Sequence, residues 1–429
     1  MGVLSLHTSK ETKAILNAIK ALGHEPIWLR NEDIQFYTDG ITVDPHPDID
    51  IVVNRLLFTK GSRPLEDLAL VQIYDELRPV LNDPSAVLAA SHKYATIAAL
   101  TEADVTVPES FFALDQSVLD EARKRIGARV VQKAAIAAGG AKVWRLEETD
   151  SLVPPIGERR TFLQKFLSSS PTRPWDVRAY VVEGEVLGAM KRHAAADEWR
   201  TNVARDAEVE GLPEPLPAEI TDLATQAAAT LGLDYAGVDL IEQDGVWYIL
   251  EVNATAGFKG LFEATEISIA PYIAQLAIER AGGHVDEEQV ETLATTLDDS
   301  EPLSNPTAET TPRDRSTVGY TEKVTIGGTT DTMTTTAKAD TGTQRTSIDL
   351  GLASNVGAGP ITGKHKVKSG TQQTTTARPL VDVTIGLRGA WHTVTVSVED
   401  REHMSYPVLL GRDILKHHRI DLQRRGDEE

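Results

Sequence analysis

The stretch AGVDLIEQDGVWYILEVNATAG, residues 236–257, decides the fold of the middle of this chain. Two apolar runs flank Asp244-Gly245, and such a pair between apolar runs is typical of a β-hairpin turn. Other strand pairs, such as RVVQK with AKVWRL, alternate with helical stretches from residue 81 to residue 283. Hairpins mixed with helices predict an α+β domain rather than a doubly wound parallel sheet.

The turn decides which side chains of the hairpin share a face. We expect a three-residue loop, residues 243–245, with Gly245 left-handed. Successive side chains of a strand alternate between its faces, so Asp239, Glu251 and Asn253 then point to the same side, whereas a two-residue loop would put Asp239 on the opposite one. Two carboxylates and an amide oxygen form an oxygen-only site, which Mg²⁺ prefers when phosphates complete its octahedron. The alternative is that these residues are solvated polar groups at a strand end.

The segments on either side predict two further domains. Residues 1–80 read as strand, helix and strand followed by the apolar run IDIVVNRL, which predicts a small α/β domain with a parallel sheet. Residues 284–316 are acidic, rich in Thr and Pro and poor in aromatic residues, so we expect a solvated, flexible linker. The Thr- and Gly-rich runs of residues 317–420 predict a small all-β domain.

The composition restricts the class of protein. The 429 residues include 64 Asp and Glu against 43 Lys and Arg, and the formal charge of −21 argues against nucleic acid or an anionic membrane as a partner. Such a charge suits a protein kept soluble in strong salt, but an ordinary acidic cytosolic protein would show it too. The lack of cysteine excludes disulfides, thiolate metal sites and a cysteine nucleophile. MGVLSLHTSK carries no long apolar run, so we expect a cytoplasmic protein without signal peptide or membrane-spanning helix.

Metal–phosphate chemistry also needs cations and free backbone N–H groups, and the chain supplies both. Lys133 ends a predicted strand, and Gly139-Gly140 lies in the loop before the next one, where bare N–H groups can approach phosphate oxygens. Each basic residue alone would be an ordinary surface charge, but together they are unusual in so acidic a chain. The other candidates are Lys93, Arg178, Lys191, Arg192, Arg200 and the amide of Asn202.

These motifs follow one another in an order that resembles the ATP-grasp ligases, specifically the RimK-type glutamate ligases. They are LND, Lys93, VVQK, the Gly-Gly loop, QKFL, DVRAYVV, KRH, WRTN, GVDL and LEVNATAG. The resemblance covers residues 80–282. It implies an ATP-grasp fold for residues 81–283, preceded by an α/β domain.

The resemblance also implies a role for each motif residue. The nucleotide phosphates would be held by Lys93, Lys133, Gly139 and Gly140. The strand that pairs with adenine through its backbone would be Gln164, Lys165, Phe166 and Leu167, with Asp176 near the ribose. Arg200 and Asn202 would be catalytic residues near the γ-phosphate. Arg178 and Arg192 are candidates for holding carboxylates, because a guanidinium fork matches two oxygens. Two Mg²⁺ or Mn²⁺ ions would be held by Asp239, Glu251 and Asn253, with Glu251 bridging them.

Two departures from the family bear on these roles. Lys165 stands where relatives usually carry an acidic residue, although adenine recognition there uses mainly the backbone. The phosphate loop AAIAAGGAK is rich in Ala where relatives carry polar residues, which weakens the expected contacts to ATP.

The reaction that the resemblance implies joins a carboxylate to an amine. ATP phosphorylates the carboxylate of an acceptor, such as a protein C-terminus, and the amine of L-glutamate or a similar amino acid attacks the acyl phosphate. Positioning and electrostatic stabilisation carry such a phosphoryl transfer, so no enzyme nucleophile is needed, in agreement with the missing cysteine. Relatives often form oligomers, and we expect a homo-oligomer.

A second motif lies near the C-terminus. Asp340-Thr341-Gly342 is the triplet that carries the catalytic aspartate of aspartic peptidases, and PVLLGRDIL follows about seventy residues later. The pair resembles retroviral-type peptidases and, more closely, the retropepsin-like family, named as zinc proteases, that accompanies RimK-type ligases. An aspartic mechanism needs two carboxylates, so two chains would have to pair, each giving Asp340 as a catalytic residue.

Several features limit this second resemblance. Retroviral peptidases carry an Asp at the position of Gln344 that pairs with the Arg of the Gly-Arg-Asp turn, so Arg412 lacks that partner here. Asp-Thr-Gly is also a common turn sequence. Apart from the adjacent His417 and His418, the histidines show no spacing typical of a helix-borne ligand pair, so no zinc site is predicted. The histidines in question are His365, His392, His403, His417 and His418.

The sequence therefore predicts an ATP- and Mg²⁺-dependent glutamate ligase with an accessory retropepsin-like domain, and one domain would add residues to a protein tail that the other trims. Three alternatives stay open. The acceptor could be a small molecule of cofactor or amino-acid biosynthesis. The chain could be a dimeric aspartic peptidase with a regulatory nucleotide-binding part. The ATP-grasp part could also be an inert binding module, which the presence of all three metal-site residues disfavours.

Overall fold

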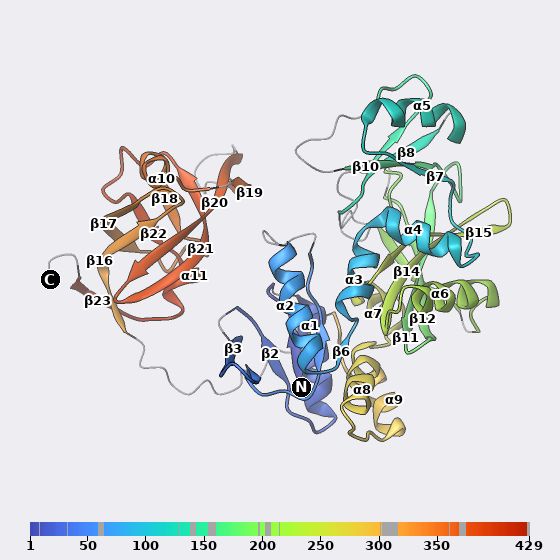
Figure 1. Cartoon of the computed structure of the whole chain (residues 1–429), viewed down its shortest axis with the longest axis horizontal. Helices are drawn as coiled ribbons and strands as arrows, with labels where there is room; N and C mark the ends of the chain where they lie inside the picture. Colours follow the sequence, from blue (N-terminus) through green and yellow to red (C-terminus); the bar gives the residue numbers. More distant parts are fainter. Residues whose placement is uncertain are drawn as a thin grey trace. The chain divides into compact units, whose positions relative to one another are not determined.

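The computed structural model describes the chain except residues 8, 32, 59–63, 128, 138–142, 153–159, 196–197, 202–206, 214, 301, 303–315, 360, 369–374 and 427–429. Two compact units follow one another along the chain, Met1–Ala308 and Glu309–Glu429 (Figure 1). Each unit contains its own buried apolar clusters, so each is described by itself.

The first unit begins with a parallel sheet, as predicted. Its strands are β1 (Gly2–Leu4), β2 (Ile27–Leu29), β5 (Val52–Asn54) and β6 (Val80–Leu81), in the order β2-β1-β5-β6. Alternate residues of these strands pack on opposite sides, Val3 with α1 (Lys10–Ala21) and Leu4 with α2 (Pro64–Leu77). The hairpin of β3 (Gln35–Thr38) and β4 (Val43–His46) lies between β2 and β5 in the chain.

Two antiparallel sheets form the middle of the unit, which confirms the α+β prediction. The first has the order β7-β10-β8-β9, and α5 (Gln116–Ile126) packs against β7 and β10. Its strands are β7 (Ser110–Phe112), β10 (Thr161–Lys165), β8 (Val130–Ala134) and β9 (Val143–Leu146). The second has the order β13-β12-β11-β14-β15. Its strands are β13 (Glu208–Gly211), β12 (Glu185–His193), β11 (Trp175–Val182), β14 (Tyr235–Gln243) and β15 (Val246–Asn253).

Helices cover both faces of the second sheet. On one face, α6 (Ala218–Thr230) packs through Ile220 and Ala224 against Val238 and Leu240. On the other face, α7 (Lys259–Thr265) and α8 (Ala270–Arg280) share a cluster with Tyr180 of β11. The hairpin side chains of the candidate site lie on this second face of the sheet, the one that carries Tyr180 and is opposite α6.

Two consecutive helices lead into the ATP-grasp region. Asp83 caps α3 (Pro84–Ser91) by accepting hydrogen bonds from the backbone N–H groups of Ser85 and Ala86 at 2.7 and 2.9 Å. His92 caps α4 (Lys93–Glu102), which puts Lys93 in the first turn. The Lys93 backbone N–H donates to the Ala135 carbonyl at 2.8 Å, so this turn is fixed beside the end of β8.

One part of the expected linker is a helix. Residues 287–296 form α9 (Glu287–Thr296), which begins after Asp286. Its Val290 is buried in the apolar cluster that contains α8, and its Ala294 is buried as well. The prediction of a flexible linker is wrong for this stretch. Although the sequence is acidic, two apolar residues four positions apart lie on the same side of a helix, and that side can be buried. Residues 303–315 lie outside the described part of the chain.

The second unit is an all-β domain, as predicted, with two short helices, α10 (Leu350–Val356) and α11 (Arg412–Leu415). The sheet order is β19-β20-β21-β18-β22-β17-β16-β23, and a further pairing between β20 and β16 folds the sheet onto itself. The strands are β16 (Thr317–Gly327), β17 (Thr332–Ala339), β18 (Ser347–Asp349), β19 (Ile361–Lys368), β20 (Thr375–Leu387), β21 (Ala390–Glu399), β22 (Val408–Leu410) and β23 (Arg419–Arg425).

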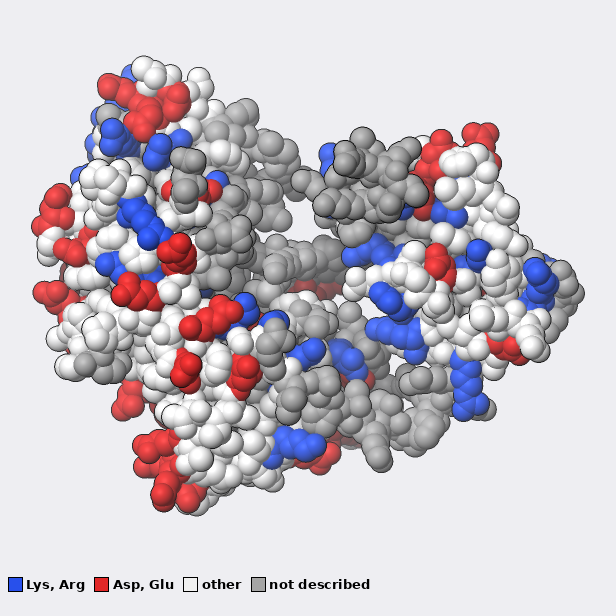
Figure 2. Space-filling model, turned by 180° about the vertical axis from the view of Figure 1, so that it is seen from behind, with Lys and Arg blue, Asp and Glu red and all other residues white. Residues whose placement is uncertain are grey.

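The two units differ in charge. Residues 309–429 contain 16 Lys and Arg against 15 Asp and Glu, so all of the net negative charge lies in residues 1–308. On the face seen in Figure 2, Lys and Arg side chains gather on the C-terminal unit, while acidic side chains are spread over the first unit. Among the described helices, none combines the length and the apolar composition that crossing a membrane requires.

Candidate active site

The turn of the central hairpin differs from the prediction. Asp244 and Gly245 alone form the loop, with φ of 55° and 79°, and Gln243 pairs with Val246 across it. The expected three-residue loop is therefore wrong. Asp and Gly both tolerate the left-handed conformation that a two-residue hairpin turn of this type requires.

A β-bulge nevertheless brings the two predicted carboxylates to one face. In a regular ladder from a two-residue loop, Asp239 would pair with Leu250 and Glu251 would turn to the core face. Instead Leu250 is an extra residue, so that Asp239 pairs with Glu251, and Gly237 pairs with Asn253. Cross-strand partners lie on the same face, so the two carboxylates point to the same side, although the bulge and not the turn causes this.

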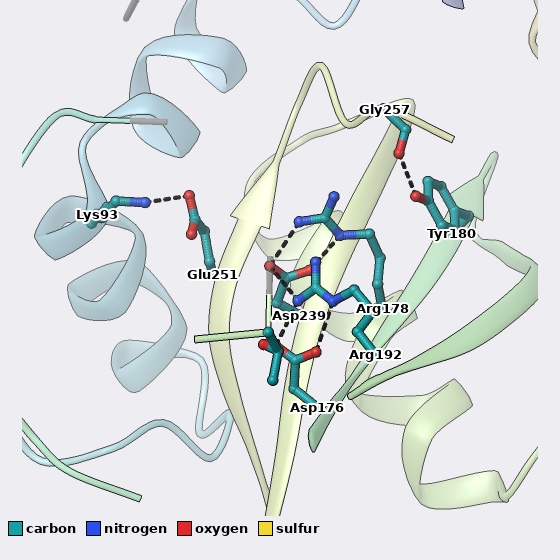
Figure 3. Close-up of polar contacts among 9 residues, drawn as sticks. Lys93, Asp176, Arg178, Tyr180, Arg192, Asp239, Glu251 and Gly257 are labelled. Atoms are coloured by element: carbon teal, nitrogen blue, oxygen red, sulfur yellow. Dashed lines mark hydrogen bonds and ion pairs between the residues drawn. The ribbon is translucent and has the colours of Figure 1, made fainter. Parts of the chain in front are cut away.

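Two arginines hold Asp239 (Figure 3). Arg178 donates from Nε and Nη2 to the two carboxylate oxygens at 2.6 and 2.8 Å, and Arg192 Nη2 lies 3.1 Å from Oδ2. Arg192 also donates to both oxygens of Asp176, at 2.7 and 2.6 Å, and Thr201 Oγ1 donates to Asp176 at 2.5 Å. Burial by itself would raise the pKa of Asp239, but the two guanidiniums outweigh it and lower that pKa to about 2. Two buried anions are thus balanced by two buried cations.

Two lysines reach the same region from other elements. Lys93 Nζ of α4 donates to Glu251 Oε1, and Lys133 Nζ of β8 donates to Gln164 Oε1 at 2.5 Å. Burial and the positive charge of Lys93 lower the pKa of Lys133 to about 8. Lys133 is therefore a cation at neutral pH that can lose its proton in mildly alkaline solution.

A cleft of about 910 Å³ brings most of the predicted residues together. Its polar lining includes Lys93, Lys133, Gln164, Lys165, Asp176, Arg192, Arg200, Asp239 and Glu251. Its apolar lining includes Val131, Phe166, Leu167, Trp175, Trp199, Ile241 and Leu250. An apolar slot beside cations and carboxylates suits a nucleotide, with the base against the apolar wall and the phosphates near the cations.

Some predicted residues do not line this cleft. Arg178 is not among the residues that line it, although its partner Asp239 is. Asn253 lines a second, neighbouring cavity, where its buried Nδ2 has no hydrogen-bond partner. Gly139, Gly140 and Asn202 lie outside the described residues.

Glu198 is a part of the site that sequence reasoning missed. It accepts hydrogen bonds from Arg200 Nε at 3.0 Å and Nη2 at 2.8 Å, and from the Trp199 backbone N–H at 2.9 Å. The hydrogen bonds from Arg200 are the main reason why the pKa of Glu198 falls to about 2. The acid lies only two positions before Arg200, but adjacent opposite charges are too common in this chain to have indicated the contact.

The oxygen donors on this face fit Mg²⁺. Asp239 and Glu251 supply carboxylates from paired strands, and Asn253 supplies an amide two residues further on. Among the described residues, no cluster of three or more His, Asp or Glu side chains that could hold a metal ion is found. Arg178, Arg192 and Lys93 pair with these carboxylates in this structure.

In the C-terminal unit, the Asp-Thr-Gly and Gly-Arg-Asp motifs lie next to each other. They follow β17 and β22, which pair in parallel, and the Asp340 backbone N–H donates to the Leu410 carbonyl at 2.9 Å. Asp413 accepts from the Thr346 backbone N–H at 2.8 Å and from Thr346 Oγ1 at 2.7 Å. This contact ties the turn to the chain after the triplet without using Gln344 or Arg412 side chains.

Three histidines meet behind that turn. His418 Nε2 lies 3.2 Å from His392 Nε2, and the His417 ring stacks on His392 with ring centres 5.6 Å apart. Ser316 Oγ lies 2.9 Å from His418 Nδ1. The sequence could not indicate this cluster, because its members come from β21 and from the segment between α11 and β23.

Comparison with known proteins gives two family matches. Residues 90–277 match the RimK-like ATP-grasp domain, and residues 353–425 match the retropepsin-like aspartic endopeptidase RimB. A tetrahydromethanopterin:alpha-L-glutamate ligase of Methanocaldococcus jannaschii is 30% identical over 213 residues, which are 47% of this chain and 70% of that protein. A probable alpha-L-glutamate ligase of Mannheimia succiniciproducens is 28% identical over 231 residues, 52% of this chain and 75% of that one.

A third relative and one solved structure agree with these matches. The alpha-aminoadipate–LysW ligase LysX of Saccharolobus solfataricus is 24% identical over 278 residues, 63% of this chain and 97% of that protein. The ATP-grasp ligase PsnB, solved with a phosphomimetic variant of its minimal precursor, Mg and ADP, is 20% identical over 65% of this chain and 98% of its own, with a TM-score of 0.52. That likeness shows the fold alone. Together with the site geometry, these findings establish that the chain belongs to the RimK-like ATP-grasp ligases and carries a RimB-like, retropepsin-like domain at its C-terminal end.

Proposed function

We propose that the chain joins L-glutamate, or a similar amino acid, to the carboxylate of an acceptor such as a protein C-terminus, using ATP and two Mg²⁺ ions. The observation that carries this proposal is the pairing of Asp239 with Glu251 on the cleft face, with Lys93 and Lys133 beside them. We further propose that residues 81–283 form the ligase domain, that residues 317–420 form the peptidase-like domain, and that the protein acts in the cytoplasm, where ATP and free glutamate are available.

The chemistry would proceed in two steps. An acceptor carboxylate oxygen attacks the γ-phosphorus, the bond to the β,γ-bridging oxygen breaks, and ADP leaves. The amine nitrogen of glutamate then attacks the acyl carbon, loses a proton, and phosphate leaves as the amide forms. Mg²⁺ held by Asp239, Glu251 and Asn253 would supply charge neutralisation at the phosphates. Lys133 and Arg200 would stabilise the charge that develops on the transferred group, and Glu198 keeps Arg200 in place.

The residues of the site are arranged for an exchange of partners. The two carboxylates proposed to bind Mg²⁺ are each paired with a cation, Glu251 with Lys93 and Asp239 with Arg178. We propose that these cations bind phosphate or a substrate carboxylate. When the metal and the nucleotide bind together, each carboxylate would exchange its cation for Mg²⁺, and each cation would exchange its carboxylate for a phosphate or a substrate carboxylate. Neither buried charge is left uncompensated in that exchange, so the site favours simultaneous binding of the two.

ADP release with ATP and Mg²⁺, measured with and without L-glutamate and cell extract, tests the proposal. We expect release that needs both additions, together with a mass gain of glutamate on one acceptor. Glu251→Gln should lower the rate at least about 100-fold, because it removes a proposed metal ligand. Glu242→Gln is the matched control, since Glu242 pairs with Trp247 near the turn of the same hairpin. ADP release that ignores every amino acid would contradict the ligase and favour a nucleotide-sensing role.

The proposed ligase could act on a protein tail or on a small molecule, and the identity of the acceptor distinguishes these two functions. The M. jannaschii and S. solfataricus relatives are named for a cofactor and for a protein, respectively. We propose the protein tail, and a purified ribosomal-protein tail and a small cofactor acid compared in the same assay would decide. Modification of the cofactor acid alone would establish the biosynthetic alternative.

We also propose that the C-terminal unit is an aspartic peptidase in which two chains each supply Asp340, and that it trims what the ligase adds. The observation that supports this is the contact between the Asp-Thr-Gly and Gly-Arg-Asp segments. Because two chains must pair, the rate of peptide cleavage should rise more steeply than in proportion to the protein concentration, and it should be lost in Asp340→Asn. If Asp340→Asn leaves the length distribution of added residues unchanged, the trimming role is wrong.

A further inference from the structure

His92 connects the consecutive helices α3 and α4 and fixes the first turn of the second. With φ of −99° and ψ of 98°, it ends α3 and directly precedes Lys93, the first residue of α4. Its Nδ1 accepts a hydrogen bond from the Ala95 backbone N–H at 3.1 Å. The imidazole thus takes the place where helices more often carry Ser, Thr, Asp or Asn, and it satisfies a donor that has no partner within the helix.

The same turn is held from α3 and from the neighbouring sheet. The His92 ring meets the Phe112 ring of β7 at 84°, with ring centres 5.6 Å apart, and the ring of Tyr94 stacks on Phe112 at 5.2 Å. The buried Thr96 donates from its backbone N–H to the His92 carbonyl at 3.0 Å. Its Oγ1 donates to the Ala89 carbonyl of α3 at 2.9 Å. The imidazole is therefore part of a packed junction between three elements.

This turn carries Lys93, one of the cations that line the nucleotide cleft. The Lys93 backbone N–H donates to the Ala135 carbonyl at 2.8 Å, and its Nζ, on a side chain that is 10% exposed, donates to Glu251. The ammonium group of a lysine lies at the end of a flexible stem, so its place depends on where the backbone is held. Fraying of the first turn would release that backbone on the side of His92.

We propose that His92 is the positioning residue for Lys93, and that it acts only as the unprotonated imidazole. The proposal rests on the ligase function above, in which Lys93 binds the nucleotide phosphates. Nδ1 accepts from a backbone N–H and so carries no hydrogen, whereas a protonated imidazole carries one on each nitrogen and cannot accept. A proton therefore removes this cap, which a Ser or Asn cap would keep in mild acid.

The elements packed against α4 differ in the charges that they bring to this turn. α3 and β7, with the sequences PSAVLAAS and SFF, carry no charged side chain. The charged side chains of β8, β15 and α6 and at the far end of α4 are Lys133, Glu251, Glu219, Asp222 and Glu102. Glu251 already pairs with Lys93, and burial together with the charge of Lys93 lowers the pKa of Lys133. A further cation here is also opposed by the dipole of α4, so a proton on His92 should loosen the turn.

Binding of MgADP, followed by the fluorescence of Trp175 and Trp199 in the cleft, tests the proposal without the ligation reaction. His92→Ala should raise the Kd about fivefold, which corresponds to the usual effect of losing a helix cap. His92→Asn keeps an acceptor at the cap and should bind as the wild type does at pH 7.5. Asp115→Ala is the matched control, because it removes the cap of α5, where Asp115 accepts from the Ser117 N–H at 2.8 Å, and it should leave the Kd unchanged.

A double-mutant cycle shows whether His92 acts through Lys93. Lys93→Met should raise the Kd at least about tenfold, because a charged hydrogen-bond donor is lost. In that variant His92→Ala should add nothing, since the group that it positions is already gone. Effects that multiply instead would overturn the positioning role.

A pH series tests the dependence on the unprotonated ring. Between about pH 7.5 and about pH 5.5, the Kd of the wild type should rise relative to that of His92→Asn, because histidine gains a proton in this range and asparagine does not. A constant ratio, or a wild type that gains affinity in acid, would contradict the titratable cap.

The outcomes separate this inference from the proposed function. A chain that binds MgADP through Lys93 but shows no glutamate-dependent turnover would lose the ligase function and keep the role of His92. Glutamate-dependent turnover with equal Kd values for the wild type and His92→Ala would overturn the inference alone. A wild type that binds no MgADP would remove both.

Discussion

Asp239 is the residue on which the buried charges of the site converge. Its side chain is 6% exposed, and those of Arg178 and Arg192 are 15% and 2% exposed. Replacement by Asn would leave two buried guanidiniums with one carboxylate between them. We expect Asp239→Asn to lower the free energy of unfolding of the first unit by about 3 kcal/mol, besides abolishing turnover. Thermal and urea unfolding measure this change.

An exposed ion pair provides the control for that prediction. Arg173, which precedes β11, and Glu208 of β13 lie 2.5 Å apart, but their side chains are 50% and 75% exposed. Glu208→Gln should leave the unfolding midpoint nearly unchanged, because water screens such a pair. Equal losses in Asp239→Asn and Glu208→Gln would mean that burial adds nothing to the first pair.

Lys133 gives the site a predictable pH dependence. Its pKa of about 8 lies below the usual value for lysine, because burial and Lys93 both disfavour the charged form. The side chain is a cation below pH 8 and becomes neutral above it, so nucleotide affinity should fall by up to about tenfold between pH 7 and pH 9. Fluorescence of Trp175 and Trp199, which line the cleft, reports ADP binding. Lys133→Arg should remove the dependence, since arginine stays charged, and a decline that persists in this variant would assign it to another group.

At the level of elements, the sequence predicted which strands form and could not predict their register. The two apolar runs indicated β14 and β15, and Asp244-Gly245 indicated the turn. The bulge at Leu250 depends on how Ile249 and Val252 both fit the core beside α6, which no local pattern contains. The helix α9 was missed for the same reason, since an acidic Thr-rich stretch becomes a helix only when α8 covers Val290.

A buried asparagine connects the end of β6 with the start of β14 and the end of β15. Asn82, which follows β6, accepts from the backbone N–H groups of Asp234 and Tyr235 at 2.8 and 3.2 Å and donates to the carbonyls of Tyr235 and Ala254 at 2.8 Å. Its φ of 57° also suits Asn better than Ala. Asn82→Ala should cost about 3 kcal/mol of stability, as four hydrogen bonds are lost, three of them buried. The neighbouring Asp83→Ala, which removes only a helix cap, should cost about 1 kcal/mol by urea unfolding. Similar losses would contradict the connecting role.

The histidine cluster makes the C-terminal unit sensitive to acid. Burial, and then the charges of His418 and His417, lower the pKa of His392 to about 4, and burial also lowers the pKa of His418. Asp413 and Glu322 oppose these shifts. A depressed histidine pKa means that the unfolded chain binds protons first, so stability is lost as the pH falls from about 6.5 toward 4. The melting temperature should fall by about 5 °C over this range and by less in His392→Gln.

At the scale of the whole molecule, the ordered motifs predicted both families, because each motif residue has a chemical reason for its place. What they could not supply were contacts between residues with no sequence signal, such as Glu198 with Arg200 and Asp413 with Thr346. The loop glycines and Asn202 lie outside the described residues, so their roles stay predictions.

The presence of two units with separate cores leads to a prediction for the full-length chain. Calorimetry should show two transitions, one for each core. ADP with Mg²⁺ at about a hundredfold excess over its Kd should stabilise only the first unit, by about 2.7 kcal/mol, because the cleft residues all belong to residues 1–308. Acid in the range of the histidine cluster should shift only the other transition, which His392→Gln identifies. A single transition that MgADP raises as a whole would show instead that the two cores unfold together, and the C-terminal unit would then be stabilised by a ligand bound to the first.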